Sequence, residues 1–161
     1  MVMRRKEREI SDCNEIMNFI ASQEVLRLVF NDAEGICITP MNYGYVVKED
    51  HGLILYMHGA SEGRRAAAIK AGLSEVVFEI DGCHAANDDK GCGATYYYKS
   101  VIGKAKLSLV EDKEEKVDAL DAIMDNIIGG GEYEYQDAVI DKTCIIRLDV
   151  TEWSCKANLP K

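Results

Sequence analysis

Three strand-like stretches follow one another early in the sequence, separated only by short turns. They cover residues 25–31, 36–47 and 53–58, and the connections DAEG and KEDHG are rich in turn-forming residues. Strands joined by so few residues pair antiparallel, because a parallel connection needs a long crossover. Pro40 lies within the second stretch and lacks a backbone donor, so that strand is expected at a sheet edge or at a bulge.

Helices are expected to interrupt the strands at three places. Asp12 and Asp112, each followed three residues later by a glutamate, form capping boxes. They predict one helix over 12–22 and another that begins at Asp112 and ends at the glycine run 129–131. Between them, Ser61 is the expected N-cap of a short helix rich in alanine.

Three more strands complete the pattern. Residues 74–80, 95–110 and 143–150 have the branched or alternating apolar residues of strands, and 81–93 is a polar loop with glycines. Because helices do not alternate regularly with strands, a doubly wound parallel sheet is disfavoured. The sequence predicts a mainly β fold, an antiparallel barrel with peripheral helices.

Composition limits the possible partners. The 161 residues carry 19 Lys+Arg and 28 Asp+Glu, a formal charge of −9, with 47% hydrophobic residues and two prolines. Such a chain can build a core, and one domain over residues 1–161 is expected. The acidic balance disfavours nucleic-acid and membrane-surface partners. With no long apolar run and no secretory pattern, we expect a cytoplasmic protein with reduced cysteines.

The densest candidate site is the segment HGASEGRR at 58–65. A strand end, a turn of small residues and a helix start place backbone donors near Arg64 and Arg65, an arrangement that suits a phosphate. The competing interpretation is a solvated helix start with two ordinary surface arginines. Taken alone, the segment favours that second interpretation.

Two further segments contain polar groups on strands. In TPMNYGY (39–45), Pro40 and Gly44 interrupt regular pairing, so free backbone groups are available to a flat heterocycle; an edge strand with a bulge explains the same residues. In YYYKSVIGKAK (96–106), aromatic residues precede Lys99 and Ser100, which fits either a stacking surface or a strand facing a partner chain.

One loop contains potential metal ligands. Cys83, His84 and Cys92 flank a single loop, but no finger or ribbon spacing is present. We therefore expect free thiols there and no metal site.

Taken together, TPMNYGY, LILYMHGASEGRR, YKSVIGKAKL and DVTEWSCK resemble, in order and spacing, the pyridoxamine 5′-phosphate oxidase-like superfamily of split barrels that bind flavin mononucleotide (FMN). The closest similarity is to its nitroimidazole-resistance branch. The resemblance implies a six-stranded Greek-key barrel and a homodimer with FMN at the interface. It also implies a set of cofactor-binding residues: Thr39, Met41, Asn42, Tyr43, Ser61, Arg64, Arg65, Ser100, Val101, Trp153 and Lys156.

Within that set, the resemblance implies different roles. Arg64 and Arg65 would hold the phosphate, and residues 39–43 would line the isoalloxazine ring largely through backbone groups. His58 matches a histidine on the substrate side of the pocket and is the expected catalytic residue. Cys155 stands where the family has a glycine, beside Lys156, so the local backbone there is open to question.

The resulting expectation is an FMN-dependent oxidoreductase acting on a small planar or nitro-aromatic molecule. The alternative is a flavin- or haem-binding module of the same fold without turnover. A haem would need an axial ligand, and the chain offers His51, His58 and His84.

Overall fold

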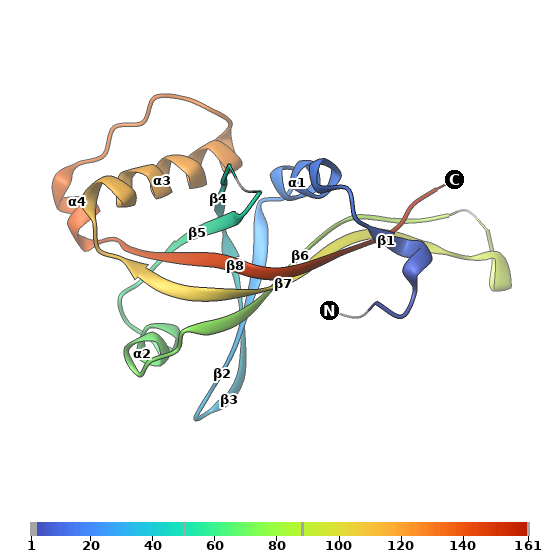
Figure 1. Ribbon diagram of the computed structural model, residues 1–161, viewed down its shortest axis with the longest axis horizontal. Coiled ribbons are helices and arrows are strands. Elements are labelled where there is room, and N and C mark those ends of the chain that lie inside the picture. The colour runs from blue at the N-terminus through green and yellow to red at the C-terminus, as the bar shows by residue number, and fades with distance from the viewer. Residues whose placement is uncertain (1–2, 50, 88, 161) are drawn as a thin grey trace.

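The computed structural model describes residues 3–49, 51–87 and 89–160 and has eight strands and four α-helices in that part of the chain (Figure 1). The strands are β1 Glu9–Ile10, β2 Val25–Asp32, β3 Gly35–Asn42, β4 Gly44–Val47, β5 Leu53–Gly59, β6 Glu75–Ala86, β7 Tyr96–Val110 and β8 Cys144–Asn158. The helices are α1 Cys13–Ala21, α2 Arg64–Lys70, α3 Lys113–Ile128 and α4 Asp137–Lys142, with single 3₁₀ turns at Lys6–Arg8 and Gly91–Gly93.

All eight strands form one antiparallel sheet in the order β3-β2-β6-β7-β8-β5-β4, with β1 beside β8. The mainly β, antiparallel split-barrel fold predicted from the sequence is confirmed. The expected count of six strands is wrong: Tyr43 divides the stretch 36–47 into β3 and β4, and the two-residue β1 adds another strand. Pro40 lies on β3, which ends the sheet order, so the predicted edge position is correct.

Two strands run well beyond their predicted ends. β6 continues to Ala86 through residues expected to form a loop, with a register shift between Gly82 and Ala85. β8 continues to Asn158, eight residues past the predicted end at 150, because β7 pairs with it along almost its whole length. Figure 1 shows β6 and β7 projecting together past the body of the molecule, beside β1.

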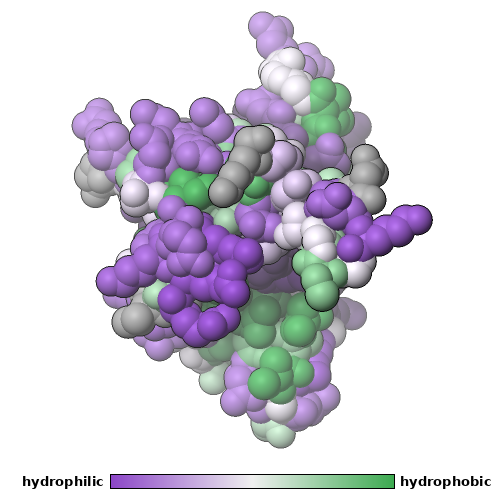
Figure 2. Space-filling model, turned by 90° about the vertical axis from the view of Figure 1, so that its right-hand side faces the viewer, coloured by the Kyte–Doolittle hydropathy of each residue, from purple (hydrophilic) through white to green (hydrophobic). Residues whose placement is uncertain are grey.

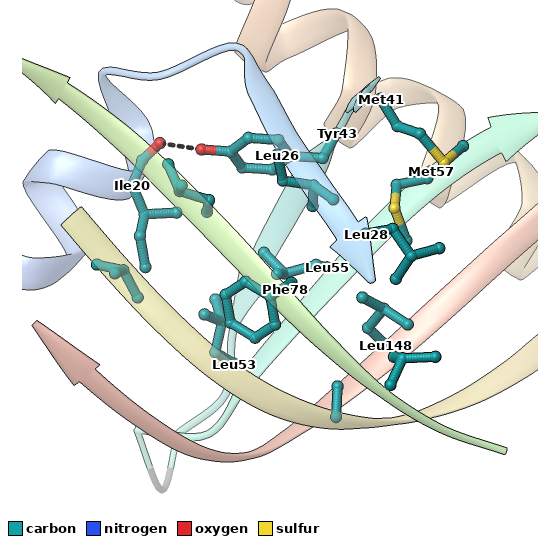
Figure 3. Packing of buried hydrophobic residues seen from close by; sticks show 14 of the residues in the cluster. Ile20, Leu26, Leu28, Met41, Tyr43, Leu53, Leu55, Met57, Phe78 and Leu148 are labelled. Carbon is teal, nitrogen blue, oxygen red and sulfur yellow. Dashed lines mark hydrogen bonds between the residues drawn. The ribbon is translucent and has the colours of Figure 1, made fainter. Parts of the chain in front are cut away.

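The main core fills the interior of the barrel (Figure 3). Leu28, Leu55, Phe78 and Leu148 come from four strands and are almost fully buried, because alternate residues of each strand face inward. Tyr43 joins this core, and its hydroxyl donates a 2.6 Å hydrogen bond to the carbonyl oxygen of Ile20 on α1. The bond satisfies a phenol that is otherwise removed from water.

Helix α3 covers the outer face of β4 and β5 and forms a second core. Asp112 caps the helix by accepting from the backbone N–H of Glu115, as the capping box predicts. A Cβ atom on Gly44 would lie 2.3 Å from the backbone of Ala122, so only glycine lets β4 approach the helix this closely. No helix in the described residues is long and apolar enough to cross a bilayer.

Candidate functional site

Helix α2 is the element that presents the two predicted phosphate-binding arginines. It begins at Arg64, and its N-cap is Gly63, with a φ of 93° and no side-chain capping bond. The prediction that Ser61 caps this helix is therefore wrong. The backbone carbonyl of Ser61 instead accepts a hydrogen bond from Lys70 at 3.2 Å, which ties the turn to the far end of the helix.

Arg64 is engaged with the turn between β2 and β3. Its Nε and Nη2 donate to the two carboxylate oxygens of Asp32 at 2.9 and 2.7 Å, and Nη2 also donates to the carbonyl oxygen of Gly35 at 2.8 Å. The bidentate pair with Arg64 lowers the pKa of Asp32. In this structure the guanidinium of Arg64 therefore binds the β2–β3 hairpin, and its donors are not free to bind a phosphate.

Arg65, one residue further, has no carboxylate partner among the described residues. The residue is half-buried, and Nη1 lies 3.3 Å from the sulfur of Met41. A Cβ atom on Gly59 would lie 2.0 Å from Nη2, so the strand end at Gly59 has room for this guanidinium only because it carries no side chain. A shielded cation without a counterion is a suitable group to bind a phosphate.

The β3 residues predicted to line a flavin ring have separate surroundings. Thr39 is half-buried and Asn42 is exposed, with its amide nitrogen donating to the carbonyl of Glu24 at 3.0 Å. Met41 is buried beside Arg65. Because β3 ends the sheet, the side away from β2 has no strand partner in the described chain.

Tyr43 is occupied in the protein interior. Its side chain is fully buried and bonded to Ile20, and its carbonyl oxygen accepts from Asn126 at 3.0 Å. Burial raises the pKa of Tyr43 well above the ordinary range of a phenol. The contacts of Tyr43 are therefore structural.

His58 lies on β5 next to Gly59, with its side chain exposed. It pairs with Ile145, which belongs to the core under α3, so its imidazole is on the opposite face of β5 from the space occupied by Arg65. β4 pairs with β5 only as far as Tyr56, so the adjacent edge of residues 57–59 lacks that strand partner. A molecule that contacts both His58 and Arg65 would have to pass this open edge.

The second predicted group lies on β7 and β8. Ser100 is paired with Lys156, and Val101 with Cys155. Ser100 and Lys156 are half-buried, whereas Val101 is fully buried and points inward. Trp153 pairs with Gly103 and packs against the main core. β8 continues as a regular strand through Cys155, so the thiol at the family's glycine position does not disturb the backbone pairing.

The two predicted groups lie near opposite ends of β7. Arg65 lines a small cavity of about 60 Å³ together with Leu109 and Cys144, whereas Ser100 is nine residues earlier on the same strand. At about 3.4 Å per residue, these nine residues correspond to about 30 Å measured along the strand.

Two residues near Ser100, Arg8 and Tyr98, were not among the predicted site residues. Nη1 of Arg8 donates to the hydroxyl of Tyr98 at 3.3 Å, and Nζ of Lys156 lies 5.7 Å from the centre of the same ring. The tyrosine run was visible in the sequence, but the position of Arg8 depends on the pairing of β1 with β8.

The loop with potential metal ligands is partly a strand. Cys83 is exposed in the irregular part of β6 with a φ of 59°, and Nε2 of His84 lies 2.8 Å from Asp81. Within the residues that the structure describes, no group of three or more His, Cys, Asp or Glu side chains has the geometry of a metal site.

Comparison of the sequence and the structure with known proteins identifies the family of this chain. The family model described as pyridoxamine 5′-phosphate oxidase matches residues 12–157. A candidate 5-nitroimidazole antibiotic resistance protein from Bacteroides thetaiotaomicron is 25% identical with a TM-score of 0.79, over 92% of this chain and 86% of that chain. A search of curated protein sequences finds no match.

Two other solved structures share the fold at lower identity. The flavocytochrome Anf3 from Azotobacter vinelandii is 18% identical with a TM-score of 0.79, over 99% of this chain and 73% of that one. An FAD- and haem-binding protein from Mycobacterium smegmatis is 14% identical with a TM-score of 0.80, over 95% and 74%. The family match over most of the sequence and the shared barrel show that this chain belongs to the pyridoxamine 5′-phosphate oxidase family of split-barrel proteins.

Proposed function

We propose that this protein binds FMN and is an oxidoreductase for a small planar or nitro-aromatic molecule. The observation that carries the proposal is Arg65, a half-buried residue whose guanidinium no carboxylate neutralises in the described chain. Other support comes from the names of the solved relatives, which include flavin-binding proteins and a candidate 5-nitroimidazole antibiotic resistance protein. Bound FMN supplies the two-electron chemistry, and the protein supplies position and access.

The phosphate is assigned to Arg65 rather than to both arginines. A charge-assisted hydrogen bond contributes about 1.5–3 kcal/mol, which corresponds to about 10- to 100-fold in affinity. Arg64 already makes three such contacts with Asp32 and Gly35 and would have to give them up to reach a phosphate. Arg65 loses little free energy when it exchanges Met41 for an anion, because a thioether sulfur is a weak hydrogen-bond acceptor.

FMN binding is measured by equilibrium dialysis, after a spectrum of the protein as isolated and mass measurement of any released cofactor. We expect a flavin spectrum, a loss of at least tenfold in FMN affinity in Arg65→Gln, and at most about a threefold loss in the neighbouring Arg64→Gln. A haem Soret band, or a protein that binds no added FMN, would contradict the proposal. Equal losses in both variants would contradict the assignment to Arg65.

The second part of the proposal is that the cofactor site is shared between two chains. The two groups of family-matched residues are separated by up to nine residues of β7, about 30 Å of strand, which favours a site in which a second copy supplies one of them. The outer face of β2, β3 and β6 offers a surface for that copy. Ile36 and Ile38 there are 73% and 61% exposed, and Ile36 lines a groove of 660 Å³. Figure 2 shows an apolar patch at its lower end, where Figure 1 places the hairpin of β2 and β3.

Light scattering tests the shared site. We expect the mass of two chains for the wild type, and one chain with at least tenfold weaker FMN binding for the double variant Ile36→Asp/Ile38→Asp. Both side chains are already exposed, so the single chain keeps its core. Ile128→Asp, equally exposed but on α3, is the control and should stay dimeric. A monomeric wild type that binds FMN tightly would exclude the shared site.

His58 is proposed to orient the substrate or to hold a proton for it, since an imidazole can donate or accept a hydrogen bond through its ring nitrogens. We expect His58→Ala to retain FMN but to slow the reoxidation of dithionite-reduced, FMN-loaded protein by a 5-nitroimidazole. His51→Ala, which changes an exposed histidine in a turn, is the control. Loss of FMN together with the reaction would make His58 a cofactor-binding residue instead.

A further inference from the structure

Two cations converge on the phenol of Tyr98, at the end of β7 that lies beside β1. Arg8 donates to the Tyr98 hydroxyl at 3.3 Å, and the ammonium group of Lys156 lies 5.7 Å from the ring centre, within the range of a cation–π contact. All three side chains are half-buried. The positive charges of Arg8 and Lys156 are therefore screened by salt less than those of fully exposed side chains.

Backbone pairing holds the N-terminal cation in place. Glu9 pairs with Lys156 and Ile10 with Cys155, so Arg8 directly precedes a strand that is fixed along the end of β8. Ile10 packs against the main core. Ser100, opposite Lys156 on β7, adds a hydroxyl to the same region.

The four half-buried arginines of the structure fall into two classes. Arg64 and Arg147 each bind a carboxylate through two nitrogens. Arg8 and Arg65 have no carboxylate partner among the described residues. The geometry that marks Arg65 as a phosphate ligand is thus repeated by Arg8 at the other end of the sheet.

Two carboxylate residues that are paired with members of this region do not neutralise it. Asp81, opposite Ser100, is bound to Arg27 and to His84. Glu9, opposite Lys156, is exposed and makes no ion pair with it in the described chain. Burial acts to raise the pKa of Tyr98, but Arg8 and Lys156 outweigh it and the net shift is downward, as expected in a positive field.

We propose that Arg8, Tyr98 and Lys156 form a binding subsite for an oxyanion, either a carboxylate or a phosphate, on the molecule that the flavin acts on. A guanidinium, a phenol and an ammonium group offer several donors and two positive charges to one anion. The subsite itself stands on this geometry, and only its assignment to the substrate rests on the proposed function. In the shared site proposed above, the partner's α2 would hold the cofactor near this end of β7.

Calorimetric titration of the FMN-loaded protein with inorganic phosphate, and separately with acetate, tests the proposal at low ionic strength, where charge effects are largest. We expect one bound anion per chain for at least one of the two probes, whereas equal concentrations of chloride bind far more weakly. Arg8→Gln should weaken that binding at least tenfold. Arg5→Gln is the matched control, because Arg5 lies in the same segment, is exposed and pairs with Glu7.

A second measurement does not depend on how well Arg8→Gln folds. The phenolate absorbance of Tyr98, taken as the difference between the wild type and Tyr98→Phe, should titrate at higher pH in phosphate or acetate than in chloride, because a bound oxyanion cancels the nearby positive charge. No binding of either probe, unchanged binding in Arg8→Gln, or no shift of the phenol titration would overturn the proposal. Anion binding that FMN abolishes would place the cofactor's own phosphate here and overturn it as well.

FMN affinity is measured on the same samples, so that the two proposals fail separately. We expect Arg8→Gln to bind FMN within about twofold of the wild type while its phosphate affinity falls. If the wild type binds no FMN, the proposed function fails. The same anion titrations on the flavin-free protein then decide whether the subsite exists.

Discussion

Gly103 leaves the space that the ring of Phe78 fills. A Cβ atom on Gly103 would lie 2.4 Å from Cε1 of Phe78, and the two residues are directly paired between β6 and β7. Phe78 is fully buried, so it cannot move aside into solvent. The smallest residue on β7 and one of the largest in the core are therefore matched in shape.

This match predicts the effect of adding one methyl group. Gly103→Ala should lower the free energy of unfolding by about 1–3 kcal/mol, because it overpacks a filled core. In a Phe78→Leu background the same change should cost less, and the cost that remains comes from the backbone carbonyl oxygen of Glu152, 2.9 Å from the added Cβ. Urea unfolding of the four proteins gives the coupling energy. A cost for Gly103→Ala that is the same in both backgrounds would show that the ring is not the obstacle.

Removal of the Tyr43 hydroxyl should be costly for its size. Tyr43→Phe leaves the carbonyl of Ile20 without its buried donor, so we expect a loss of about 1–3 kcal/mol in unfolding free energy. Tyr45→Phe changes a half-buried tyrosine on β4 that makes no hydroxyl bond in the described structure, and should stay within about 0.5 kcal/mol. Equal effects would mean that the bond to Ile20 contributes little.

Four of the six thiols should differ sharply in their reactivity. Burial raises the pKa of Cys155 to about 11, and the side chain is almost fully enclosed, so it should react with a thiol reagent at pH 8 only after unfolding. Cys13, Cys83 and Cys92 are exposed and should react at once. Mass spectrometry of the labelled peptides identifies each site. Rapid labelling of Cys155 in the folded protein would show that the core around it opens.

Acid should weaken the fold through Asp149. Hydrogen bonds from Arg147 and Lys48 lower the pKa of Asp149 below its ordinary 3.8, so the unfolded chain binds this proton more tightly than the folded one. The contribution of Asp149 to stability is therefore complete above about pH 4 and is lost as the pH falls through the folded-state pKa. We expect Tm to fall less steeply below pH 4 in Asp149→Asn. Asp118→Asn, an exposed control on α3, should keep the wild-type slope.

Local signals predicted the element types well and their ends poorly. The caps at Asp12 and Asp112 are correct because a cap depends on three or four neighbouring residues. The polar residues after Asp81 carry no strand signal, yet they pair with β7, so the ladder with a distant partner decides where β6 ends. α4 and β1 are too short for any periodic pattern to show.

The sequence could not separate the roles of adjacent basic residues. Arg64 and Arg65 are adjacent residues of the same type, so the sequence does not distinguish them. Only the folded position of Asp32, 32 residues earlier in the chain, shows that Arg64 binds the β2–β3 hairpin. Lys99 is similar: it is buried and bonded to Glu15 on α1 at 2.7 Å, and nothing in the run of tyrosines before it indicates that partner. The one indication in the sequence is that Lys99 lies two residues before Val101, so both side chains are expected on the inward face of the strand.

The side-chain amide of Asn126 has a consequence for how the protein comes apart. Its nitrogen donates to the carbonyl of Gln23 at 2.9 Å and to that of Tyr43 at 3.0 Å, so one group on α3 fastens two segments from the other end of the chain. If either segment detached while α3 stayed in place, the amide nitrogen of Asn126 would lose one of its two hydrogen bonds. Fluctuations that release α3 should therefore expose the amides of all three regions to deuterium at a common rate, as one cooperative unit.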